Sequence, residues 1–180
     1  IDGIIELKNE LGFSTAELDD IDIGLSETAL NIIGYPLSDK QNPKSVVDGQ
    51  FSMPFCAAVT VKSGGLKWDD YKNHLNDSDT LSLCNKIKVS PDKDAEECCP
   101  EFMSAKVKVV VKGKKYEKFV KIPKGEPKNF MEDSEFISKF RSLTEPYLSN
   151  ERIDQLTGSM LKLDQSNNIN SIFEFSQIDR

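Results

Sequence analysis

The segment around Pro54 carries the strongest chemical signal, because this proline interrupts a run of apolar residues at helical spacing. Proline has no N–H and clashes with the carbonyl four residues earlier, here that of Gln50. The helix therefore begins near Pro54 or kinks there, and its spacing predicts that Phe51 and Phe55 are buried. In either case the backbone polar groups from Gln50 to Met53 lack helical partners and need water, a side chain or a ligand.

Elsewhere the residue types that do chemistry do not form a recognisable catalytic pattern. His74 is the only histidine, so a Ser-His-acid triad would have to use it, yet its polar neighbours predict a solvent-exposed turn. Gly64-Gly65 lacks the spacing and the lysine of a phosphate-binding loop. The cysteines form neither a C-x-x-C motif nor a disulfide framework, which predicts reduced thiols, a cytoplasmic location and no metal site. They are Cys56, Cys84, Cys98 and Cys99.

Composition and charge narrow the class of protein. The chain has 180 residues, of which 38% are hydrophobic and 29% charged, as expected for a globular domain. Its net charge of −7 argues against a nucleic-acid partner, which usually requires a basic surface. No apolar run approaches the roughly 18 residues of a membrane span. The first residues lack methionine and a basic signal segment and fit a helix, so we expect a fragment of a longer protein.

Periodicity indicates the elements that surround the Pro54 segment. Residues 1–11 predict an amphipathic helix, and residues 20–25 alternate as a strand that would continue to residue 32. Residues 34–45 have the composition of a long loop, and residues 91–101 that of an acidic surface loop. We therefore expect helices and strands to mix along the chain.

Two lysine-rich strands on either side of Gly113 predict a β-hairpin over residues 106–122. Alternation places three valines toward the core and three lysines toward water, where lysines also protect a sheet edge from pairing. The valines are Val107, Val109 and Val111, and the lysines are Lys106, Lys108 and Lys112.

The last part of the chain reads as helices with apolar faces. Asp133 or Ser134 is expected to cap one helix and Ser149 the next. The order of elements predicts an α+β fold, in which an antiparallel sheet of about four strands is covered by helices on one face and followed by C-terminal helices.

Three segments, in order along the chain, resemble signature sequences of the MmgE/PrpD family. The first runs from Pro43 to Ala58 and contains Gln-Phe-Ser-x-Pro followed by an aromatic residue. The second is Lys124–Asn129, followed at the expected distance by Lys139-Phe140, and the third is the opening Ile1-Asp2-Gly3. The family includes 2-methylcitrate dehydratase, cis-aconitate decarboxylase and iminodisuccinate epimerase.

The resemblance implies that residues 1–180 are the C-terminal α+β lid domain of a larger two-domain protein. Residues 132–180 would return to a helical domain that this chain lacks. Family members act on di- and tricarboxylates without a metal or organic cofactor, by removing a proton next to a carboxylate. Their acid–base groups lie mainly in the helical domain, so we expect no catalytic residue here and no turnover by the chain alone. Dehydration, decarboxylation and epimerisation all remain open.

The resemblance also implies that residues 40–52 face the substrate cleft and exclude water from it. Lys44 would pair with a substrate carboxylate, and Gln50 and Ser52, with Asn42 beside them, would donate neutral hydrogen bonds. Each of these residues could instead be a helix cap or an ordinary surface residue. The expected partners are a small carboxylate and the helical domain, with no nucleic acid and no membrane.

Two other functions remain open from the sequence. The chain could be a self-standing, non-catalytic module that binds a small molecule or a protein, or an independent enzyme that uses surface carboxylates. The C-terminal helices carry more apolar surface than a small sheet needs, which also predicts a homodimer at high concentration.

Overall fold

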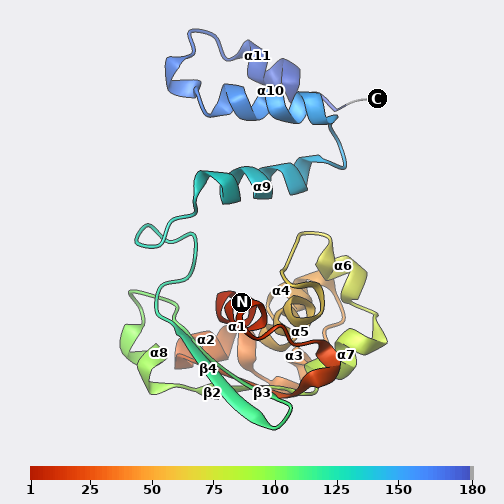
Figure 1. Cartoon of the computed structure of the whole chain (residues 1–180), viewed down its shortest axis with the longest axis vertical. Helices are drawn as coiled ribbons and strands as arrows, with labels where there is room; N and C mark the ends of the chain where they lie inside the picture. Colours follow the sequence, from red (N-terminus) through yellow and green to blue (C-terminus); the bar gives the residue numbers. More distant parts are fainter. Residues whose placement is uncertain (179–180) are drawn as a thin grey trace. The chain divides into compact units, whose positions relative to one another are not determined.

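The computed structural model describes residues 1–178, and the chain divides into two compact units. The first unit spans Ile1–Asn129 and holds a sheet packed against helices, whereas the second begins at Phe130 and is helical (Figure 1). The predicted α+β class is confirmed. Within residues 1–178, no helix combines the length and the apolar character that crossing a membrane requires. That residues 132–180 pack on a helical domain outside the chain stays a prediction.

The first unit is built on a four-stranded sheet in the order β2-β1-β3-β4. Its strands are β1 (Leu18–Leu25), β2 (Ile87–Pro91), β3 (Ala105–Val111) and β4 (Lys114–Val120). The prediction that the sheet is antiparallel is wrong for one pair of strands, since β2 runs parallel to β1. Only Ile87 and Val89 are buried in β2, a pattern too short to be told from a loop in the sequence. The helices between β1 and β2 provide the crossover that a parallel pair needs.

β3 and β4 form the predicted hairpin, with Val109 opposite Tyr116. Lys112 and Gly113 make the turn, both with positive φ, as a two-residue type I′ turn requires. Val107, Val109 and Val111 are buried as predicted. Lys108 and Lys112 are exposed, but Lys106 is not simply in water. Its ammonium lies 3.1 Å from Asp92 and also pairs with Asp94, which leaves its side chain 18% exposed.

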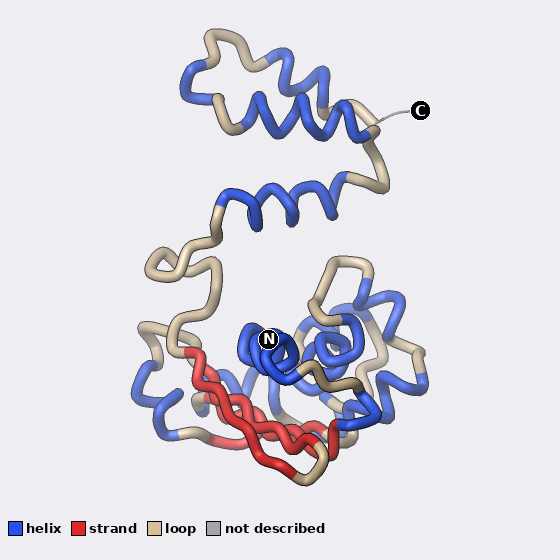
Figure 2. Tube along the Cα trace, in the orientation of Figure 1, coloured by secondary structure: helices blue, strands red, loops and turns tan. Residues whose placement is uncertain are grey.

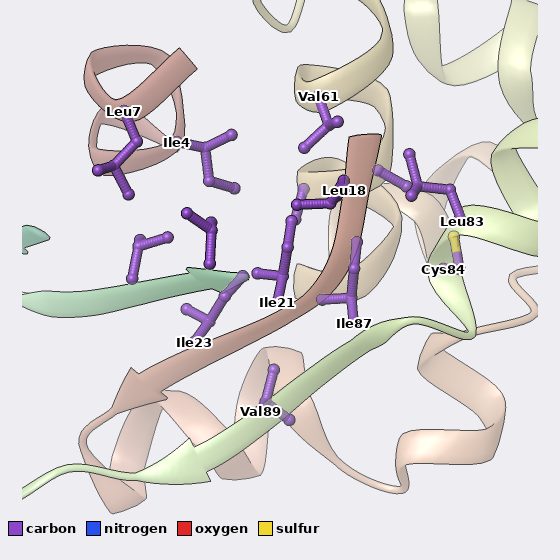
Figure 3. Packing of buried hydrophobic residues seen from close by; sticks show 14 of the residues in the cluster. Ile4, Leu7, Leu18, Ile21, Ile23, Val61, Leu83, Cys84, Ile87 and Val89 are labelled. Atoms are coloured by element: carbon purple, nitrogen blue, oxygen red, sulfur yellow. The ribbon is translucent and has the colours of Figure 1, made fainter. Parts of the chain in front are cut away.

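The core of this unit lies between one face of the sheet and two helices, α1 (Asp2–Leu11) and α5 (Met53–Ser63) (Figures 2 and 3). Ile21 and Ile23 of β1 point toward these helices, and Ile4 and Leu7 of α1 meet them (Figure 3). In α5 every residue from Pro54 to Val61 is buried, as expected of a helix that is apolar all round. The helix that begins at the Pro54 segment therefore lies at the centre of the buried core.

Short helices occupy segments that the sequence assigned to strand or loop. The strand does not continue to residue 32, because Ser26 caps a helix there by accepting a hydrogen bond from the Ala29 amide (3.3 Å). Asp92 likewise caps a helix within residues 91–101. The apolar residues after Ser26 fit either a strand or a helix, so these single capping side chains decide the outcome. The helical elements concerned are α2 (Glu27–Ala29), the π-helical turn η2 (Leu30–Gly34), α3 (Leu37–Lys40) and α8 (Lys93–Cys98).

The remaining helical elements of the first unit are η1 (Thr15–Glu17), α4 (Val46–Gln50), α6 (Asp70–His74) and α7 (Ser78–Cys84). The predicted first helix is confirmed, and Gly12 ends it in the left-handed conformation at φ 65°.

The second unit contains α9 (Asp133–Thr144), α10 (Asn150–Met160), η3 (Leu163–Gln165) and α11 (Asn170–Phe175). Ser149 caps α10 as predicted, whereas α9 is capped one residue early, by Glu132. Among the described residues of this unit, only Ile153 and Leu156 are fully buried. Large apolar side chains at the predicted faces are exposed, including Phe136 (54%), Leu143 (44%) and Met160 (49%).

Candidate functional site

The predicted break at Pro54 is confirmed and separates two helices. α4 ends at Gln50, Phe51 and Ser52 leave the helical conformation, and Pro54 lies in the first turn of α5, where no N–H is needed. Phe55 is completely buried. The prediction that Phe51 is also buried is wrong: the break ends the helical register, and Phe51 is 51% exposed.

Ser52 satisfies backbone groups at this break. Its hydroxyl oxygen accepts a hydrogen bond from the Phe55 amide (3.0 Å) and its O–H donates to the Lys40 carbonyl. The residue is 1% exposed. A hydroxyl has a single hydrogen to donate, so Ser52 has none left for a ligand. This geometry favours the helix-cap alternative for Ser52.

Lys40 is a second residue that binds backbone carbonyls near the break, and the sequence analysis did not identify it. Its ammonium donates to the Ile32 carbonyl (2.8 Å) and to the Phe51 carbonyl (2.7 Å). The signal that could have identified it was present: a break in a helix leaves carbonyls unpaired, and a nearby lysine is a natural donor to them.

A pocket of about 550 Å³ opens beside this break. Its walls come from α3 and the two residues before it on one side and from α4 and Phe51 on the other, with the linker between α3 and α4 at its rim. Of the predicted site residues, Asn42 and Lys44 line it, whereas Gln50 and Ser52 do not. The lining residues are Tyr35, Pro36, Ser38, Asp39, Lys40, Asn42, Pro43, Lys44, Val47, Asp48 and Phe51.

The acidic groups of the pocket are already engaged by local hydrogen bonds. Ser45 caps α4 by accepting from the Asp48 amide (3.1 Å), and the Asp48 carboxylate accepts from the Lys44 amide (3.1 Å). Hydrogen bonds from the Ser45 hydroxyl and the Lys44 amide lower the pKa of Asp48, so it stays ionised at neutral pH. Asp39 accepts from the Ser38 hydroxyl (3.2 Å).

Two polar side chains on the rim remain available. Within residues 1–178, the Lys44 ammonium makes no hydrogen bond or ion pair, and neither does the Asn42 side-chain amide. An ammonium and an amide N–H are both donors, and a carboxylate is one small-molecule group that accepts from both. Exposed apolar surface of Tyr35, Val47 and Phe51 lies beside them. The pocket can therefore hold a small carboxylate with a short hydrocarbon skeleton.

His74 lies outside this pocket. The prediction that it is solvent-exposed is wrong, since only 17% of its side chain is exposed. Its Nδ1 is 3.0 Å from the Thr80 hydroxyl, and its Nε2 is 3.4 Å from the Ser63 hydroxyl. Asp77 does not complete a triad, because its carboxylate is 3.7 Å from Nδ1 and is bound by Thr80 and by Lys62 (2.5 Å). The cluster holds the start of α7, which Asp77 caps.

All four cysteines are free thiols. Burial raises the pKa of Cys56 to about 11 and that of Cys84 to about 12, so both are protonated at neutral pH and pack as small apolar groups. Neither lines the pocket.

Comparison with known proteins agrees with the resemblance of the three segments. No curated protein sequence matches the chain significantly. The family model described as the MmgE/PrpD C-terminal domain matches residues 1–163 of the 180. The match covers all of the first unit, including the pocket, and continues through α10. The chain therefore belongs to the MmgE/PrpD family, in which it corresponds to the C-terminal domain.

Proposed function

We propose that this chain is the lid domain of a cofactor-independent lyase or isomerase that acts on di- or tricarboxylates, similar to 2-methylcitrate dehydratase. The supporting observation is the rim of the pocket, where Lys44 and Asn42 present an ammonium and an amide that no described residue engages. Membership of the family supplies the class of enzyme. The rim supplies the donors that a carboxylate substrate requires.

In this proposal the lid binds and encloses the substrate, and a helical domain outside this chain moves the proton. Lys44 pairs with one carboxylate of the substrate and Asn42 donates a neutral hydrogen bond beside it. Val47 and Phe51 cover the hydrocarbon part, which strengthens both polar contacts by excluding water. Gln50 and Ser52 do not line the pocket, and Ser52 supports its wall by capping α5.

The second unit provides the proposed surface for the helical domain. Phe136, Leu143 and Met160 are between 44% and 54% exposed. Monomeric proteins rarely leave large contiguous apolar patches in water. We propose that the helical domain covers these side chains, and that a second copy of the chain does so when that domain is absent.

One observation favours the alternative, a self-standing binding module. Every residue that lines the pocket lies between Tyr35 and Phe51, so its walls do not depend on another domain. On this alternative the chain binds a carboxylate fully by itself and has no catalytic partner.

Turnover distinguishes the two functions. The 180-residue chain and the same chain joined to a preceding helical domain are each assayed with 2-methylcitrate, citrate and cis-aconitate. We expect no turnover by the chain alone and clear turnover by the joined protein. Lys44→Met in the joined protein should raise KM by about tenfold, as expected when a charged hydrogen bond to the substrate is lost. Turnover by the chain alone would reject the lid proposal, and a joined protein that folds but lacks turnover would favour the binding module.

A further inference from the structure

Lys40 joins three segments around the pocket. Its ammonium binds the Ile32 carbonyl in η2 and the Phe51 carbonyl at the α4–α5 break, at 2.8 Å and 2.7 Å. Its own backbone carbonyl accepts from the Ser52 hydroxyl. Lys40 is the last residue of α3, so η2, α3 and the start of α5 are linked through this one residue.

The bonds to Phe51 and Ser52 join the two sides of the pocket, whereas the bond to Ile32 stays on the side of η2 and α3. Tyr35, Pro36 and Ser38 lie on the side of η2 and α3, and Val47 and Phe51 lie on the side of α4. The chain between the walls, residues 41–45, has no helix or strand that would fix its shape. Contacts between the walls therefore help to set the distance between them, and Lys40 makes two: its ammonium donates to the Phe51 carbonyl, and its own carbonyl accepts from the Ser52 hydroxyl.

We infer that Lys40 is a positioning residue for carboxylate binding, which holds the two walls so that Asn42 and Lys44 converge on one ligand. The inference rests on the proposed function of the pocket. Lys40 and Lys44 differ in their hydrogen bonds. The Lys40 ammonium donates two of its three N–H groups to backbone carbonyls, whereas the Lys44 ammonium makes no hydrogen bond or ion pair within residues 1–178.

A lysine suits this position because both of its acceptors are carbonyls at the ends of helical segments. Ile32 lies in the single turn of η2, and Phe51 directly follows α4. Such carbonyls carry partial negative charge and lack helical partners, so a cation stabilises them more than a neutral donor would. An arginine can also donate to two carbonyls but is longer and planar, so it should restore the link in part.

The test compares Lys40→Met, Lys40→Arg and Lys44→Met in the whole 180-residue chain. Two quantities are measured by NMR: amide hydrogen exchange of residues 41, 42, 44 and 45, since residue 43 is proline, and the dissociation constant for tricarballylate, a stable tricarboxylate. Lys40→Met should speed exchange of these amides and raise the dissociation constant about tenfold, whereas Lys40→Arg should recover much of both. Lys44→Met is the matched control, which should weaken binding without changing exchange.

Any other result would overturn the inference, and each of the three contrary results has a different meaning. If Lys40→Met speeds exchange but binds tricarballylate as the wild type does, the link is structural only. If Lys40→Met weakens binding with unchanged exchange, Lys40 contacts the ligand directly and does not position other residues. If the wild type does not bind tricarballylate, the proposed function of the pocket fails first. Methyl signals of Val107 and Val109 in the core verify that each variant is folded.

Discussion

Replacing Ser52 by alanine should destabilise the first unit by about 2–3 kcal/mol, a large fraction of the stability of a domain. The substitution removes the cap of α5, which typically contributes about 1 kcal/mol. It also leaves the Lys40 carbonyl without its donor in a part-buried position, at a cost of about 1–2 kcal/mol. The hydroxyl is small, so the cavity left behind adds little.

Urea denaturation followed by circular dichroism measures this loss, which corresponds to a drop of about 5–10 °C in Tm for a chain of this size. Ser45→Ala is the matched control, because Ser45 makes the equivalent cap at α4 but is exposed. It should cost about 1 kcal/mol or less. If Ser52→Ala costs no more than Ser45→Ala but abolishes carboxylate binding, then Ser52 contacts the ligand and its assignment as a structural cap is refuted.

Three further predictions concern other parts of the chain. Gly49→Ala should destabilise the first unit by about 1–3 kcal/mol in urea denaturation, because the new methyl would lie 3.0 Å from the buried ring of Phe55; an unchanged midpoint would show that α4 and α5 separate easily. The Lys112 ammonium and Ser14 lower the pKa of Glu17 to about 2, so its contribution to stability is present above pH 4.5 and is lost as pH falls toward 2. NMR titration should show Lys112→Gln moving this pKa upward, and no movement would contradict the ion pair. Sedimentation should show self-association of the chain at millimolar concentration that Leu143→Asp weakens, whereas a monomer throughout would mean that the apolar face needs no partner.

The elements with strong periodicity could be predicted from the sequence. The hairpin at Gly113 combines strict alternation with a turn residue, and the first helix combines an apolar face with a terminal glycine. β2 could not be predicted, because its burial comes from pairing with a strand about sixty residues earlier. Such non-local contacts leave no local pattern in a five-residue segment.

In the candidate site, too, the local features could be predicted from the sequence and the contacts between distant residues could not. Pro54 and its chemistry predicted a break with unpaired carbonyls, and the break is present. The donor to one of those carbonyls, Lys40, comes from a separate short helix eleven residues away, so only the folded chain reveals it. Asn42 and Lys44 both line the pocket, whereas Ser52, which the family resemblance suggested as a donor to the substrate, is buried and caps α5.

The central claim, that the pocket beside the Pro54 break binds a carboxylate, is tested most directly by titrating the 180-residue chain with tricarballylate while recording its amide NMR spectrum. The account predicts millimolar affinity, of order −4 kcal/mol, with shifts concentrated at residues 41–48. It also predicts that Lys44→Met weakens binding about tenfold and that the neutral triamide of the same skeleton does not bind. Shifts that appear elsewhere in the chain, or an affinity unchanged by Lys44→Met, would contradict it.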